Sequence, residues 1–167
     1  GEWGDSIMAP AGFSHDIRPW EGEQCIRFGV SKPGGNHDIK GIKPCRFIPV
    51  ESDISNPNLI HTKFKIIKNH YGNEDNWNHT AIEDERNLGT YFHITQGNEI
   101  QVEKQDFINA WFLLLEGKVD CYDNSKSIIT SASKGDLVYL PTESDSSIVN
   151  ANNGSSILMM MRAKNQK

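Results

Sequence analysis

The stretch NAWFLLLEGKV, residues 109–119, decides the fold of this chain, together with GDLVYLP at residues 135–141. The first stretch is a long apolar run that ends in a Glu-Gly pair, which is typical of a buried strand followed by a tight turn. The second is a glycine followed by a short apolar strand that stops at a proline. Both patterns favour short antiparallel strands over helices.

Further strand candidates recur from residue 59 onwards and are separated by polar turns. They are Thr62–Lys68, Thr90–Thr95, Ile100–Glu103, Val119–Tyr122, Ser127–Thr130, Ser146–Asn150 and Ile157–Arg162. Asn69–Asn78 is predicted as a turn, and Asn76–Asn87 is predicted to contain one or two helical turns. Many short strands with regular turns predict an all-β antiparallel jelly-roll barrel over residues 61–167.

Residues 1–60 are rich in proline and glycine and have no sustained hydrophobic period. They carry two short apolar pieces, Cys25–Val30 and Arg46–Val50, that are predicted to form short strands. Five aromatic residues in this region need burial, which a disordered segment would not provide. We therefore expect an irregular N-terminal extension that packs on the barrel. The aromatic residues are Trp3, Phe13, Trp20, Phe28 and Phe47.

The composition excludes several classes of protein. The formal net charge of −5 argues against a chain that binds nucleic acid electrostatically on its own. No run of residues approaches the ~18 apolar residues that a membrane helix needs. The three cysteines, Cys25, Cys45 and Cys121, are far apart in the sequence and form no C-x-x-C pair, so we expect reduced thiols in an intracellular protein.

The two deciding stretches resemble the two signature motifs of the cupins. Metal-binding cupins carry Gly-x5-His-x-His-x(3,4)-Glu-x6-Gly and Gly-x5-Pro-x-Gly-x2-His-x3-Asn. Gly97 and Gly117 match the two ends of the first motif, and Gly135, Pro141 and Asn150 match the second. The resemblance implies a cupin-type barrel.

The positions where these motifs place metal ligands hold no nitrogen donor. They are Glu103, Gln105, Ala110 and Ser146. Three imidazoles and a carboxylate bind a divalent transition metal, whereas this set could at most hold a hard cation together with water. The sequence therefore predicts no metal, no cofactor and no enzymatic activity.

The remaining histidines offer only a weak second site. His61, His70, His79 and His93 lie near acidic residues in the sequence, but no His-x-His or His-x3-His pair occurs. We interpret them as solvated or packed histidines, and Cys121 as a packed thiol in mid-strand.

The deciding strand is apolar on both faces, so both faces must be covered. If Ala110 points into the barrel, Phe112 and Leu114 do so too, and the alternate residues face outward. Either the N-terminal extension covers this outer face, or a second copy of the chain packs on it, or the two share it. The predicted interface residues are Trp111, Leu113, Leu115, Met159 and Met161.

Residues 89–167 are similar to the C-terminal cupin domain of the centromere protein C family, an inner-kinetochore scaffold. The resemblance rests on Asn109–Phe112, Glu116-Gly117-x-Val119, Ser127-x-x-Thr130, Val138-x-x-Pro141 and Ile148-x-Asn150, and on a last apolar strand that runs into Arg162-Ala163-Lys164. It implies a non-catalytic homodimer at the centromere in the nucleus. It also implies docking of centromere or kinetochore proteins, including factors that load the centromeric histone.

The family's nucleosome-binding segment is Arg-rich and lies upstream of the barrel, and here only Arg18-Pro19-Trp20 resembles its end. Nucleic-acid contact by this chain is therefore not expected. Two alternatives remain open. One is the ligand-sensing cupin domain of an arabinose-regulator-type bacterial transcription factor, although few residues after Met161 could form its helix-turn-helix. The other is a metal-independent cupin enzyme such as a sugar epimerase, for which His93 is the nearest acid–base candidate.

Overall fold

The computed structural model describes residues 2–7, 61–73, 75–104, 107–140 and 144–164. All of them belong to one compact unit, formed by residues 1–8 together with 50–167. Most of the predicted extension, including Cys25–Val30 and Arg46–Val50, lies outside the described residues. Gln105, one of the four positions at which the motif places metal ligands, also lies outside them.

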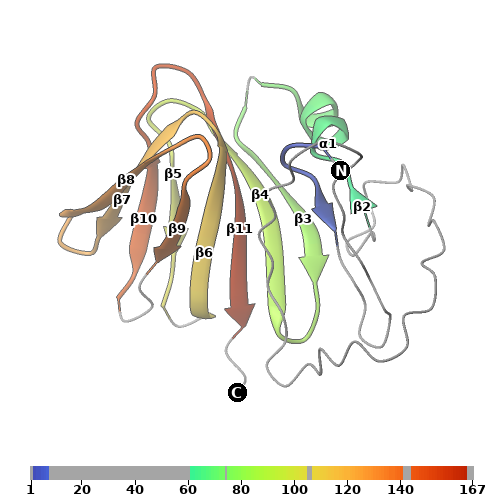
Figure 1. Cartoon of the computed structure of the whole chain (residues 1–167). Coiled ribbons are helices and arrows are strands. Elements are labelled where there is room, and N and C mark those ends of the chain that lie inside the picture. Colours follow the sequence, from blue (N-terminus) through green and yellow to red (C-terminus); the bar gives the residue numbers. More distant parts are fainter. Residues whose placement is uncertain (1, 8–60, 74, 105–106, 141–143, 165–167) are drawn as a thin grey trace, which may run out of the picture. The chain divides into compact units, whose positions relative to one another are not determined.

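Two antiparallel sheets form the body of this unit (Figure 1). The five-stranded sheet has the order β3-β4-β11-β6-β9, and the four-stranded sheet has the order β5-β10-β7-β8. The bounds are β3 Trp77–Glu83, β4 Asn87–Ile94, β5 Glu99–Val102, β6 Phe107–Glu116, β7 Lys118–Asp123, β8 Ile128–Ser133, β9 Leu137–Leu140, β10 Ser146–Asn150 and β11 Ser156–Lys164.

The strand order is that of a jelly roll. Strands β4, β6, β9 and β11 lie in one sheet, and β5, β7, β8 and β10 lie in the other, so the chain passes back and forth between the sheets. Glycines with positive φ make three of the turns, at Gly97, Gly117 and Gly135 (+78°, +83° and +95°). The predicted all-β antiparallel jelly roll is confirmed.

The core of the jelly roll is filled by side chains from both sheets. Phe112 and Leu114 were predicted to line it, and both are fully buried there. Their neighbours in the core are Ile94, Val102, Ala110, Val119, Cys121, Ala132, Leu140, Ile148, Leu158 and Met160. Alternation along the middle of β6 therefore places Ala110, Phe112 and Leu114 inside and the residues between them outside.

A second apolar cluster covers part of the outer face of the five-stranded sheet. The helix α1, Phe64–Tyr71, contributes Phe64 and Ile67 to it. From the sheet come Trp77, Ala81, Tyr91, Leu115 and Ile157, with Ile82, Leu113 and Met159 partly buried against them. The predicted outward direction of Leu113 and Leu115 is therefore correct.

The helix α1 replaces a predicted strand, Thr62–Lys68. That segment alternates apolar residues at Phe64 and Ile66, but Phe64 and Ile67 also have the i, i+3 spacing of one helical face, and the structure buries this pair. The helix ends at Gly72, whose φ is +75° and whose N–H donates to the Lys68 carbonyl at 2.9 Å.

The helical turns predicted for Asn76–Asn87 are also wrong, because β3 occupies Trp77–Glu83. Its buried residues Trp77, His79 and Ala81 alternate with more exposed ones, which is strand periodicity. The predicted turn Asn69–Asn78 is correspondingly shorter, because α1 extends to Tyr71 and β3 begins at Trp77.

The first residues of the chain pack on the same outer face. β1, Ser6–Ile7, pairs with β2, His61–Thr62. The Trp3 Nε1–H donates to the Leu115 carbonyl at 3.2 Å, and the Tyr91 hydroxyl donates to the Gly4 carbonyl at 2.7 Å.

Asp5 also supplies the cap of helix α1. Its Oδ1 accepts the Phe64 backbone N–H at 3.1 Å, and its Oδ2 lies 2.7 Å from His61 Nε2. For residues 2–7, the predicted packing of the extension on the barrel is therefore confirmed.

Candidate functional site

The cupin ligand positions lie at one end of the jelly roll, where β9 ends and β10 begins. Ala110 is fully buried and pairs across the sheet with Leu140, and Ser146 is only 3% exposed at the start of β10. The Ser146 Oγ has no hydrogen-bond partner. Glu103 is exposed just beyond β5.

Arg162 places a positive charge beside these positions. It pairs across the sheet with Ala110, and its guanidinium carbon lies 4.7 Å from the centre of the Phe107 ring and 5.5 Å from that of Phe92. One of its terminal nitrogens, Nη2, donates to the Thr90 hydroxyl at 2.9 Å. The described positions supply an alanine, a serine hydroxyl and the exposed carboxylate of Glu103, so they lack the nitrogen donors of a divalent transition-metal site. The positive charge of the neighbouring Arg162 would also repel a cation.

Asn150, which matches the asparagine of the second motif, has a structural role. Its Nδ2 donates to the carbonyls of Ile94 and Gly154 at 3.0 and 2.7 Å. Its Oδ1 accepts from the Asn152 N–H at 2.8 Å and lies 2.9 Å from the Ser156 hydroxyl oxygen. This side chain therefore joins the end of β4 to the turn between β10 and β11.

His93, the acid–base candidate of the enzyme alternative, faces away from the jelly-roll core. Its ring stacks on Trp77 in the outer cluster, with ring centres 5.4 Å apart. Its Nδ1 donates to the Asp75 carbonyl at 2.6 Å, and its buried Nε2 has no partner. His93 therefore points away from the apolar core of the jelly roll, although it is one of the residues that line the groove beside β5 described below.

Cys121 is buried in the core, as its mid-strand position predicts. Burial raises the pKa of its thiol to about 12, so the thiolate needed of a nucleophile is scarce near neutral pH. Across the described part of the chain, no group of three His, Cys, Asp or Glu residues is placed to hold a metal. The same residues include no helix long and apolar enough to cross a membrane.

His79 lies in an aromatic cluster between helix α1 and β3. Its Nδ1 is 3.4 Å from the Tyr71 hydroxyl, and Tyr71 in turn stacks on Trp77. Burial, and secondarily the nearby His70, lowers the pKa of His79 below its usual 6.5. The folded chain therefore favours neutral His79.

We expect acid to destabilise the chain through His79. As the pH falls below about 6.5, the unfolded chain binds a proton at this histidine before the folded chain does, so the free energy of unfolding decreases until the pH passes the lower folded-state pKa. Urea unfolding between pH 7.5 and pH 5 measures this decrease. In His79→Asn the decrease is expected to be smaller. If the free energy of unfolding fell equally with pH in His79→Asn and in the parent chain, His79 would not be the source of the decrease.

The predicted interface residues have different surroundings. Leu115 is fully buried inside the chain, next to Phe64 and Ile157, and therefore offers no surface to a partner. Leu113 and Met159 are partly buried against the same cluster. Trp111 and Met161, which pair across β6 and β11, are half-buried farther along the sheet.

The sequence did not single out the most exposed apolar residues on this face. Leu137 and Tyr139 lie on the edge strand β9, pair with Leu113 and Trp111, and are 51% and 60% exposed. The Tyr139 hydroxyl donates to Asn109 Oδ1 at 2.9 Å. Only the strand order reveals that β9 is an edge strand, and so the sequence carried no signal for this exposure.

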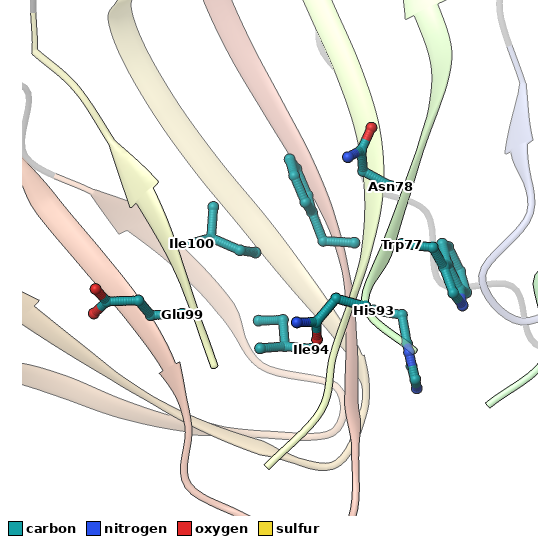
Figure 2. Close-up of a pocket in the computed structure, with 8 residues that line it drawn as sticks. Trp77, Asn78, His93, Ile94, Glu99 and Ile100 are labelled. Atoms are coloured by element: carbon teal, nitrogen blue, oxygen red, sulfur yellow. The ribbon is translucent and has the colours of Figure 1, made fainter. Parts of the chain in front are cut away.

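A groove of about 220 Å³ opens beside β5 (Figure 2). In Figure 2, Ile94 and Ile100 point toward one side of β4, and Trp77 and His93 point to the other. The lining residues include one carboxylate, Glu99, and no lysine or arginine. They are Asn76, Trp77, Asn78, Phe92, His93, Ile94, Glu99 and Ile100.

Sequence comparison finds no family model that matches this chain and no curated protein that is similar to it. Among solved structures, the chain is similar to the cupin domain of Schizosaccharomyces pombe Cnp3, with 16% identity and a TM-score of 0.47 over 56% of this chain and 64% of that one. It is also similar to a cupin superfamily protein from Desulfitobacterium hafniense, with 15% identity and a TM-score of 0.47 over 56% and 82% of the two chains. Thermus thermophilus TT1209 matches with 16% identity and a TM-score of 0.48 over 57% and 90%.

Proposed function

We propose that this chain is a non-catalytic homodimerisation and protein-docking module of a centromere or kinetochore scaffold in the nucleus. The observation that carries the dimer is the exposed apolar pair Leu137 and Tyr139 on the edge strand β9. The centromeric assignment rests on the sequence resemblance of residues 89–167 to the centromere protein C family.

A second copy suits this surface because an edge strand can pair with its own twofold-related copy. Two identical antiparallel strands meet around a twofold axis, so each side chain on one strand faces the same surface on the other. An exposed apolar edge strand that remains unpaired would favour aggregation. Trp111 on the neighbouring strand β6 and Met161, one strand farther away on β11, lie on the same face and would extend the contact.

The ligand positions support a scaffold over the alternatives. A metal-dependent cupin enzyme needs nitrogen donors, and the chain places Ala110, Ser146 and the guanidinium of Arg162 at that end of the jelly roll. A sensor or a metal-independent enzyme needs a cavity with convergent polar groups, whereas the described core is filled by apolar side chains. His93, the nearest general base, lies on the outer face.

Multi-angle light scattering of the whole chain at tens of micromolar tests the proposal. The expected result is a mass twice that of the 18.8 kDa chain. A monomer at this concentration would overturn the dimerisation. If the dimer forms, immunoprecipitation from nuclei should recover centromeric-histone loading factors with the full-length protein, and their absence would overturn the docking assignment.

A further inference from the structure

The groove beside β5 lies where the jelly roll lacks a strand. Four pairs of strands are consecutive in the chain and lie in opposite sheets: β4 with β5, β10 with β11, β6 with β7, and β8 with β9. Following these pairs along both sheets leaves β3 as the one strand of the five-stranded sheet with no counterpart in the four-stranded sheet. The missing counterpart would lie next to β5.

The groove has the parts that an added strand needs. Among the described residues, β5 is hydrogen-bonded to a neighbouring strand on one side only, by β10, so its other edge offers backbone donors and acceptors. Phe92 and Ile100 are partly buried against the core, and Ile94 is buried within it. Asn78, on β3, is exposed at the rim of the groove.

We propose that this groove binds an extended, basic segment of a partner protein, which adds as a strand to the free edge of β5. Alternate side chains of an added strand point to opposite faces of the sheet. Those on the inner face would meet Phe92 and Ile100, and apolar residues fit there. Those on the outer face would lie beside Glu99 and Gln101, whose side chains are joined by a 2.7 Å hydrogen bond, so cationic residues fit there.

The charge of the rim decides between basic and acidic partners. Glu99 is exposed, as is Asp75, which precedes the lining residue Asn76. The lining residues include the carboxylate of Glu99 and no lysine or arginine, so the side chains that line the groove favour cations. The guanidinium of Arg162, 5.5 Å from the centre of the Phe92 ring, is not part of this lining. This inference deepens the docking part of the proposed function and rests on it, but it does not depend on the dimer at β9.

The probe is a model peptide of alternating lysine and valine, six residues long, titrated into the isotope-labelled whole chain. Amide chemical shifts report where it binds. The expected result is saturable shifts at Glu99–Val102 and Asn78, and at least tenfold weaker binding of the same peptide with glutamate in place of lysine. Shifts confined to β8 or β9, equal binding of both peptides, or no shifts at millimolar peptide would overturn the proposal.

Two charge variants supply the matched comparison. Glu99→Lys is expected to weaken binding of the basic peptide at least tenfold, whereas Glu85→Lys, in the exposed turn between β3 and β4, makes the same charge change away from the groove and should leave binding unchanged. Equal loss in both variants would mean that the peptide responds only to net charge. That result would overturn a site at β5.

Hydrogen exchange of the free chain tests whether the edge is already occupied. The outward amides of β5 are expected to exchange rapidly without peptide at every protein concentration. Slow exchange at all concentrations would mean that another part of this chain covers the edge. Slow exchange only at high concentration would mean that a second copy does so, and either result overturns the proposal. Light scattering of the same samples reports dimerisation separately. A result that contradicts peptide binding at the groove can therefore be distinguished from one that contradicts dimerisation.

Discussion

Replacing Leu137 and Tyr139 together by glutamate is expected to convert the dimer into a monomer. The two side chains are 51% and 60% exposed in the single chain, so a partner that covers them gains hydrophobic free energy. In a contact between two identical chains each residue is present twice, so the double substitution changes four side chains. At about 1 kcal/mol for each half-exposed side chain, the double substitution removes about 4 kcal/mol, or roughly a thousandfold in the dimer dissociation constant. Sedimentation equilibrium measures this change.

Ile128→Glu is the matched control for this experiment. Ile128 is 58% exposed on β8, which is the edge strand of the four-stranded sheet, so it has similar exposure on a different edge. Its replacement should leave the dimer intact. Thermal unfolding of the Leu137/Tyr139 double variant should stay cooperative, because the tyrosine's main polar contact, the hydrogen bond to Asn109, is itself exposed. A double variant that is still dimeric would show that the interface lies elsewhere.

Gly117→Ala is expected to be the most destabilising of the glycine substitutions, with a loss of about 2–5 kcal/mol in the free energy of unfolding. Gly117 has a φ of +83°, where an alanine is strained. A Cβ there would also collide with the Ser156 Oγ, and it would lie 2.7 Å from the Ser155 carbonyl oxygen and 2.8 Å from the Ser156 Cα. Because these include backbone atoms, no side-chain rotation relieves the contact. Urea unfolding followed by circular dichroism measures the loss.

The collision at Gly117 also reaches the hydrogen bonds of Ser156. The Ser156 hydroxyl donates to the Lys118 carbonyl at 2.8 Å, lies 2.9 Å from Asn150 Oδ1, and accepts from the Lys118 N–H at 3.1 Å. Displacing it therefore disturbs the network that fixes the turn between β10 and β11. Loss of buried hydrogen bonds of this kind adds to the cost of the steric contact.

Gly97→Ala and Gly135→Ala separate the steric effect from the backbone strain. Both glycines have a positive φ, +78° and +95°, and no atom lies within 4 Å of a Cβ built on either. In both variants the free energy of unfolding should decrease only by the cost of holding an alanine in the left-handed conformation, about 1–2 kcal/mol. If the free energy of unfolding decreased equally in all three variants, close packing would not be the reason for glycine at position 117.

Much of the fold could be predicted from the sequence. Ala110, Phe112 and Leu114 fill the core and Leu113 and Leu115 face outward, because strand geometry fixes the alternation once a strand is recognised. Helix α1 could not be predicted, because Phe64, Ile66 and Ile67 fit a strand and a helix equally well. Packing of Phe64 and Ile67 on the outer sheet, and the cap from Asp5 far away in the sequence, favour the helix.

The candidate surfaces were predictable only in part. The sequence identified Trp111 and Met161 as outward apolar residues, but it also included Leu115, which helix α1 and its neighbours bury. It had no means of finding Leu137 and Tyr139, because their exposure follows from the edge position of β9. The groove beside β5 depends on residues from β3 and β4 in one sheet and β5 in the other, and their approach leaves no local sequence pattern.

The sequence by itself determined the jelly roll and the loss of the cupin ligands, because strand alternation, glycine turns and ligand chemistry are properties of residue type and spacing. Only the tertiary structure decided that Arg162 lies beside Ala110 and that His93 faces outward. It also decided that β5 and β9 are edge strands among the described residues. These features depend on which strands become neighbours, and strand pairing is decided by contacts between segments far apart in the chain.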